Sequence, residues 1–140
     1  MDYGKYKILL IEDDVDDAEM IIYTLRKLNS LELLHIDDGV DALEYLYDEK
    51  TPTPSMILLD LKMPKVDGIQ ILRKLKSDPA KKNIPVVALI SSKDGKNYLE
   101  SFHVNPDGYL IKPVDIKEFL GVLAKIGMSQ LEVQPPRFAL

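Results

Sequence analysis

Five short apolar runs, separated by segments of helical periodicity, are the feature that most constrains the fold of this 140-residue chain. The runs occupy residues 7–11, 32–36, 56–59, 84–90 and 108–111. The first, third and fourth are almost continuous in Ile, Leu and Val, which is typical of strands buried on both faces of a parallel sheet. In the segments between them, apolar residues recur at helical spacing, as at Ile69, Leu72 and Leu75. This alternation predicts an α/β fold, a doubly wound (βα)5 flavodoxin-like sandwich around a five-stranded parallel sheet.

Length and composition narrow the class of protein further. The length suits one domain, which we expect to span residues 1–127, with 128–140 as a C-terminal tail. The absence of cysteine excludes disulfides, thiolate zinc sites and cysteine nucleophiles. A net charge of −5 argues against a nucleic-acid-binding surface. No apolar stretch is long enough to span a membrane and no secretory leader is recognisable, so we expect a cytoplasmic protein.

Charged and hydroxyl side chains follow four of the five predicted strands. Glu12 and Asp13 follow the first strand, and Asp60 follows the third. Ser91 follows the fourth and Lys112 the fifth. The carboxyl ends of parallel strands meet at one rim, where ligands bind in folds of this class.

Clustered carboxylates repel one another, and a divalent cation such as Mg²⁺ relieves that repulsion. A carboxylate can also act as a nucleophile toward a phosphoryl group. A lone aspartate at the end of an apolar strand is more often a turn former or helix cap. Because three other strands also end in charged or hydroxyl residues, we favour a chemical role for Asp60. Asp14, Asp16 and Asp17 are expected to form only a solvated turn and helix start.

Four motifs in this order resemble the receiver domain of two-component response regulators, over roughly residues 5–126. They are KILLIEDD, ILLDLKMPKVDG, IPVVALISS and GYLIKPV. The resemblance implies that Asp60 is the phosphoacceptor and that Lys112 contacts the phosphoryl oxygens. It also implies a Mg²⁺ or Mn²⁺ site formed by Asp60, by Asp13 directly, by Glu12 through water and by the backbone carbonyl of Lys62. The Lys112–Pro113 bond is expected to be cis.

The same resemblance implies the partners. A sensor histidine kinase or a histidine phosphotransfer protein would donate the phosphoryl group from phosphohistidine. The chain would act as a stand-alone response regulator without a DNA-binding domain, through an output protein that the sequence does not identify. It would catalyse only its own phosphorylation and dephosphorylation, and homodimer formation is left open.

One residue departs from the family pattern. The family has Ser or Thr at the end of the fourth strand, and this position here is Ile90, followed by the hydroxyls of Ser91 and Ser92. We expect the strand to end early or to bulge at Ile90, so that Ser91 faces the phosphoryl group. In a regular strand, Ile90 would instead pack inward and hold Tyr109, the aromatic switch residue of the family, in one rotamer.

Three other functions remain to be weighed. A receiver-like binding module that is never phosphorylated would fit the fold, and Ile90 slightly favours it. A phosphatase of the haloacid dehalogenase type would need a second aspartate where this chain has Lys62. A flavin-binding protein would need a phosphate loop where this chain has the acidic segment that begins at Glu12.

Overall fold

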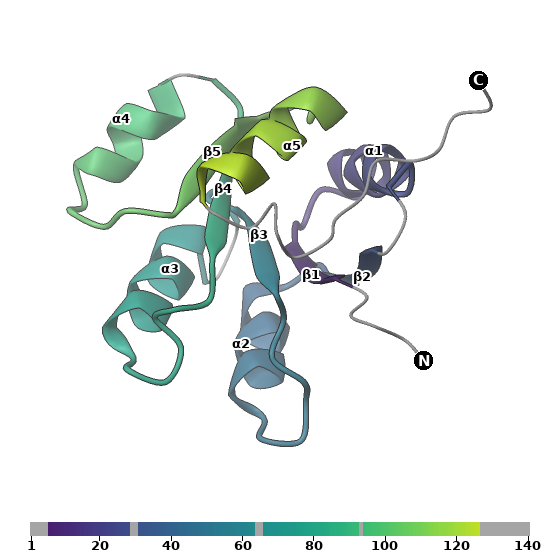
Figure 1. Ribbon diagram of the computed structural model, residues 1–140. Coiled ribbons are helices and arrows are strands. Elements are labelled where there is room, and N and C mark those ends of the chain that lie inside the picture. Colours follow the sequence, from purple (N-terminus) through teal and green to yellow (C-terminus); the bar gives the residue numbers. More distant parts are fainter. Residues whose placement is uncertain (1–5, 29–30, 64–65, 93, 127–140) are drawn as a thin grey trace.

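A five-stranded parallel sheet forms the centre of the computed structural model, which describes residues 6–28, 31–63, 66–92 and 94–126 (Figure 1). The strands are β1 (Tyr6–Ile11), β2 (Leu31–Ile36), β3 (Met56–Asp60), β4 (Val86–Ile90) and β5 (Gly108–Ile111). Their order in the sheet is β2-β1-β3-β4-β5, and every neighbouring pair is parallel. The predicted fold class is confirmed.

Five helices cover both faces of this sheet. They are α1 (Val15–Leu25), α2 (Gly39–Tyr47), α3 (Gly68–Ser77), α4 (Asp94–Glu100) and α5 (Ile116–Lys125). Helices α1 and α5 pack on one face, and α2, α3 and α4 pack on the other (Figure 1). Each face has its own apolar core, and all residues of β3 and β4 are buried between the two.

Aspartate side chains start three of the helices near the functional rim. Asp14 accepts a hydrogen bond from the Asp17 N–H at the start of α1. Asp38 accepts from the first amides of α2, and Asp67 forms a reciprocal capping box with Gln70 at the start of α3. These bonds satisfy amides that have no partner within the helix, so they fix where each helix begins.

Strand β4 differs from its predicted bounds at one end and from its predicted shape at the other. It begins at Val86 rather than at residue 84, because Pro85 has no N–H to donate to a ladder. It stays regular through Ile90, which pairs in register with Ile111. The expected early end or bulge at Ile90 is therefore wrong. The predicted tail, 128–140, lies outside the described residues.

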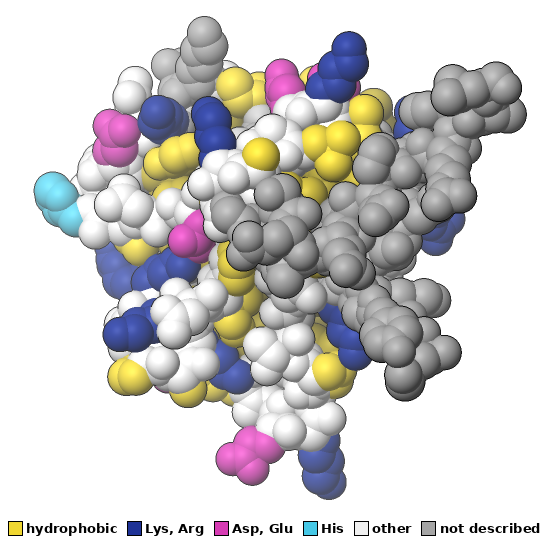
Figure 2. Space-filling model, in the orientation of Figure 1, with side chains coloured by type: hydrophobic (Ala, Val, Ile, Leu, Met, Phe, Trp, Pro, Cys, Tyr) yellow, Lys and Arg dark blue, Asp and Glu magenta, His cyan; other side chains and the backbone are white. Residues whose placement is uncertain are grey.

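The surface mixes charged and apolar groups. Figure 2 shows hydrophobic side chains reaching the surface in small patches between charged ones. Within the described ranges, no helix combines the length and the apolar character needed to cross a membrane.

Helix α3 approaches the end of β3 so closely that only glycine fits at its first residue. A Cβ on Gly68 would collide with the backbone carbonyl oxygen of Asp60 and would lie 2.6 Å from the Cα of Leu61. The Gly68 N–H donates to the Leu61 carbonyl at 3.0 Å, which holds the two segments together. The backbone around Asp60 is thus fixed by contact with α3.

A pair of glycine substitutions tests this close approach. Gly68→Ala should lower the free energy of unfolding by about 1 to 3 kcal/mol, the usual cost of overpacking a buried contact. Gly121→Ala, in α5, is the matched control, because nothing lies within 4 Å of its added Cβ. There alanine should stabilise by about 0.5 to 1 kcal/mol. Urea unfolding measures both, and equal responses would contradict the close packing.

Candidate functional site

Two buried carboxylates lie side by side at the carboxyl end of the sheet. Strands β1 and β3 pair through Ile11 and Leu59, so Glu12 and Asp60, the residues that follow this pair, meet at the rim. Glu12 is 0% exposed and Asp60 6% exposed, and no other charged residue in the described part of the chain is buried. With the half-buried Asp13, they offer carboxylate oxygens that all lie within 4.8 Å of one another.

The end of β1 is held by its neighbour β2. The Glu12 N–H donates to the Ile36 carbonyl at 3.2 Å. Nε2 of His35 donates to the Glu12 carbonyl at 2.8 Å, and the Asp14 N–H donates to Oε2 of Glu12 at 3.3 Å. His35 is therefore a structural residue, in agreement with its isolated position in the sequence.

Burial and charge together oppose ionisation of Asp60. Burial and, to a smaller extent, the neighbouring Glu12 raise the pKa of the Asp60 carboxyl to about 8. Lys112 and the backbone N–H of Lys62 act in the opposite direction. That N–H donates to Oδ1 of Asp60 at 3.3 Å. The ligand role of the Lys62 carbonyl stays a prediction.

Lys112 reaches into this acidic group from the end of β5. Its Nζ donates to Oε1 of Glu12 and to Oδ2 of Asp17, both at 2.9 Å, and lies 3.7 Å from Oδ1 of Asp60. Burial alone would lower the pKa of Lys112, but the hydrogen bonds to Glu12 and Asp17 outweigh it and raise the pKa. The Lys112–Pro113 bond is cis, as predicted.

Asp17 is the residue of this group that sequence reasoning missed. It was expected to be a solvated helix-start acid, yet it bonds to Lys112, which lies 95 positions further along the chain. Helix α1 brings it to the rim because Asp14 caps the helix through the Asp17 N–H. The position of Asp17 within the segment 12–17 does not indicate this contact, because every acidic residue there is also favourable at a helix N-terminus.

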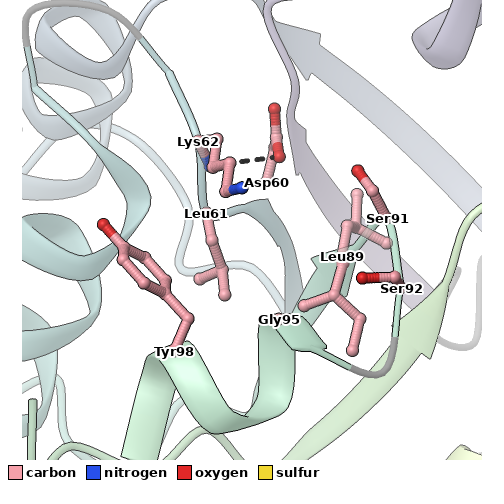
Figure 3. Close-up of a pocket in the computed structure, with 9 residues that line it drawn as sticks. Asp60, Leu61, Lys62, Leu89, Ser91, Ser92, Gly95 and Tyr98 are labelled. Atoms are coloured by element: carbon pink, nitrogen blue, oxygen red, sulfur yellow. Dashed lines mark hydrogen bonds between the residues drawn. The ribbon is translucent and has the colours of Figure 1, made fainter. Parts of the chain in front are cut away.

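A cavity of about 270 Å³ opens beside Asp60. Its lining residues come from the ends of β3 and β4 and from α4: Asp60, Leu61, Lys62, Leu89, Ile90, Ser91, Ser92, Gly95 and Tyr98. Figure 3 shows Asp60 and Lys62 at the top of the view, with Ser91 and Ser92 to the right and Tyr98 to the left. Ser91 is exposed and also lines a second hollow with Lys112. The structure therefore brings Ser91 to the rim that holds Asp60 and Lys112.

Ile90 is packed into the core and lines the inner wall of the cavity beside Asp60. It is 4% exposed and belongs to the cluster that Tyr109 and Leu99 also contact. A Cβ on Gly95 of α4 would lie 2.7 Å from the Ile90 Cβ, so the start of α4 rests directly on this side chain. Tyr109 is half-buried, with the Lys96 ammonium 5.4 Å from its ring centroid. This is the regular-strand arrangement, with Ile90 packed inward.

The acidic group suits a hard divalent cation. Three carboxylates from two adjacent strand ends offer the oxygen ligands that Mg²⁺ and Mn²⁺ prefer. Burial and, to a smaller extent, the neighbouring Glu12 raise the pKa of Asp60, and the Lys112 ammonium offsets only part of this effect. Glu12, Asp13 and Asp60 therefore fit the predicted metal site.

The chain is similar to response regulators in sequence and in fold. The family model of the response regulator receiver domain matches residues 8–124. The response regulator Rcp1 of Synechocystis sp. is 33% identical over 130 residues, which cover 89% of this chain and 88% of Rcp1. The Mn²⁺-bound form of Rcp1 superimposes with a TM-score of 0.70 at 32% identity, covering 94% of this chain and 99% of that one.

Two further solved structures are similar. The bacteriophytochrome response regulator AtBRR has a TM-score of 0.82 at 31% identity, covering 96% of both chains. The phosphorylated cyanobacterial phytochrome response regulator RcpA has a TM-score of 0.70 at 31% identity, covering 89% of this chain and 91% of its own.

The raised pKa of Asp60 generates a pH-dependent prediction. An aspartate in the unfolded chain ionises near pH 4, whereas in the folded protein the pKa is about 8. Stability contributed by the protonated form is complete below pH 4 and is lost as pH rises toward 8. The amide introduced by Asp60→Asn does not ionise, so this variant should not lose stability in this way. The free energy of unfolding of the variant should therefore exceed that of the parent by more at pH 8.5 than at pH 5.5. We expect a difference of at least about 1.4 kcal/mol, the value of one pKa unit.

Urea unfolding in chelator at the two pH values measures this gain. Added Mg²⁺ should stabilise the parent more than Asp60→Asn, because the variant has lost a carboxylate ligand. A gain that is the same at both pH values would show that Asp60 ionises normally in the folded protein.

Proposed function

The chain belongs to the receiver-domain family of response regulators, and we propose that it is a phosphoacceptor response regulator modified on Asp60. The observation that carries this proposal is the placement of Asp60: nearly buried at the end of β3, with two other carboxylates within 4.8 Å and an ammonium at 3.7 Å. A carboxylate in such surroundings can act as a nucleophile once its charge is balanced.

The proposed reaction transfers a phosphoryl group to the carboxylate of Asp60. A bond forms between a carboxylate oxygen and phosphorus, while the bond from phosphorus to a donor histidine nitrogen breaks and the imidazole keeps the electron pair. A bound Mg²⁺ would neutralise negative charge on the phosphoryl oxygens. Lys112, with its ammonium 3.7 Å from Asp60, would supply further positive charge, and the Lys62 N–H would orient the carboxylate.

The proposed donor is a histidine kinase or a histidine phosphotransfer protein, the proteins with which receiver domains interact. Two of the similar structures are phytochrome response regulators by name. A phytochrome-type histidine kinase is therefore the first donor to test. We propose that the chain catalyses only its own modification and its own dephosphorylation.

The residue two positions after Asp60 argues against the phosphatase alternative. Such an enzyme needs a second aspartate two residues after the nucleophile, and Lys62 stands there with an exposed side chain. Its ammonium lies 5.8 Å from the centroid of the Tyr98 ring, where it provides no general base.

Labelling by a small phosphodonor tests the proposal. With acetyl phosphate and Mg²⁺, the P–O bond to acetate breaks, acetate leaves with the electron pair, and the protein should gain the mass of one phosphoryl group. Asp60→Asn should show no labile gain, because an amide is a poor nucleophile. Asp16→Asn, which removes an exposed carboxylate from α1, is the matched control and should be labelled like the parent.

Two further arms of this experiment address the metal. Excess chelator should suppress labelling of the parent, and Asp13→Asn should raise the Mg²⁺ concentration needed for half-maximal labelling. A parent protein that acquires no phosphoryl group under any of these conditions would favour the receiver-like binding module. Full labelling of Asp60→Asn would exclude Asp60 as the acceptor.

The packing of Ile90 predicts how Tyr109 responds to the modification. Ile90 cannot donate a hydrogen bond, and it supports the start of α4. We expect the NMR signals of the Tyr109 ring, assigned with Tyr109→Phe, to change little when the parent is phosphorylated. Ile90→Thr supplies a hydroxyl at the end of β4 and should produce a clear change. Ile90→Val, which removes one methylene and adds no hydroxyl, is the control, and a large Tyr109 change in the parent would refute the idea.

A further inference from the structure

The ammonium group of Lys112 is shared unequally among three carboxylates. Glu12 and Asp17 accept hydrogen bonds from it at 2.9 Å, whereas Asp60 lies at 3.7 Å, beyond hydrogen-bonding distance. In this structure, therefore, the cation that should balance a phosphoryl group on Asp60 is bonded to two other acids. Before the Lys112 ammonium can form a hydrogen bond with the phosphoryl oxygens, it has to break its bond to Glu12 or to Asp17.

The two acids that hold Lys112 differ in their access to water. The side chain of Glu12 is 0% exposed, whereas that of Asp17 is 40% exposed. Removing the ammonium from Glu12 would leave a buried charge without a partner, which is costly. Asp17 can be solvated when the ammonium departs, so this bond is the easier one to exchange.

Asp17 is held in position to compete for Lys112. It lies in the first turn of α1, and its N–H donates to Oδ1 of the capping residue Asp14 at 2.9 Å. The N–H of Lys112, just after β5, donates to the Ile90 carbonyl at the end of β4 at 2.8 Å, which holds its backbone. Helix α1 and strand β5 thus bring these side chains together across 95 residues of sequence.

We propose that Asp17 is a positioning residue that draws the Lys112 ammonium away from Asp60 and thereby slows phosphorylation. This inference rests on the proposed function of Asp60. Phosphoryl transfer requires positive charge on the phosphoryl oxygens, and Asp17 competes with those oxygens for the same ammonium. Phosphorylation then moves Lys112 from Asp17 toward the phosphoryl group and leaves Asp17 to water.

The first test measures initial rates of labelling by acetyl phosphate in saturating Mg²⁺. Asp17→Asn should increase the rate by about threefold or more, the size of effect that corresponds to a partly exposed ion pair. Asp16→Asn removes the same charge from the same turn of α1, and Asp16 is not among the ion-pair partners of Lys112 in the described residues. It should leave the rate unchanged, which separates a specific contact from a general attraction of the anionic donor.

A double-mutant cycle provides a readout that a merely structural role of Asp17 would not produce. In the Lys112→Met background, Asp17→Asn should have no effect on the labelling rate, because the ammonium for which Asp17 competes is absent. Urea unfolding of each variant reports whether the fold is retained.

The labelling rates distinguish the proposed role of Asp17 from the proposed function of Asp60. Labelling of the parent at the same rate as Asp17→Asn would overturn this inference while leaving the function of Asp60 intact. A rate increase that persists without Lys112 would overturn it as well. Failure of the parent to become labelled at all would instead refute the proposed function.

Discussion

The structure depends on burying two carboxylates, Glu12 and Asp60, side by side at the end of a parallel sheet. Burial and the neighbouring Glu12 both oppose ionisation of Asp60, and its pKa is raised to about 8 in consequence. The surrounding elements compensate: β2 holds the backbone of Glu12, and Lys112 forms an ion pair with its side chain. The remaining repulsion destabilises the protein, and a divalent cation would relieve it. Stability and the proposed function would therefore be opposed at this rim, as is usual where charges are gathered for chemistry.

The parallel topology explains why residues so far apart in sequence gather here. Each crossover returns the chain to the same end of the sheet, so every strand ends at the rim where β1 and β3 place their acids. Strand β3 lies at the centre, with β1 on one side and β4 on the other. The close contact of Gly68 with the backbone of Asp60 then fixes the position of this residue. Packed backbone thus contributes to the geometry of the site together with the side-chain hydrogen bonds of Lys112 and His35.

The sequence predicted the strands, the fold class and the gathering of Glu12, Asp60 and Lys112 at one rim, because each depends on a local pattern. Asp60, Glu12 and Lys112 stand directly after apolar runs, and a parallel sheet brings such positions together whatever the details of its helices. Asp17 could not be found in this way, because its contact with Lys112 depends on how α1 packs against the sheet and not on a spacing in the sequence. The shape of β4 at Ile90 was also mispredicted. A β-branched apolar side chain that can be buried favours continuation of a strand, and at Ile90 this preference outweighs the turn-forming tendency of the two serines that follow.

The packing of Ile90 and the hydrogen bonds of Lys112 both determine which part of the structure would respond first to phosphorylation of Asp60. On the α4 side of the sheet, Ile90 is 4% exposed and in contact range of Gly95, so a shift there must displace a well-packed side chain. On the α1 side, the exchangeable bond is an ion pair with a 40% exposed carboxylate, which can open into water without disturbing the core. An added charge of roughly −1.5 to −2 acts directly on the ammonium of Lys112 and only indirectly on an isoleucine. The energetically easier response therefore runs from Asp60 through Lys112 to the first turn of α1.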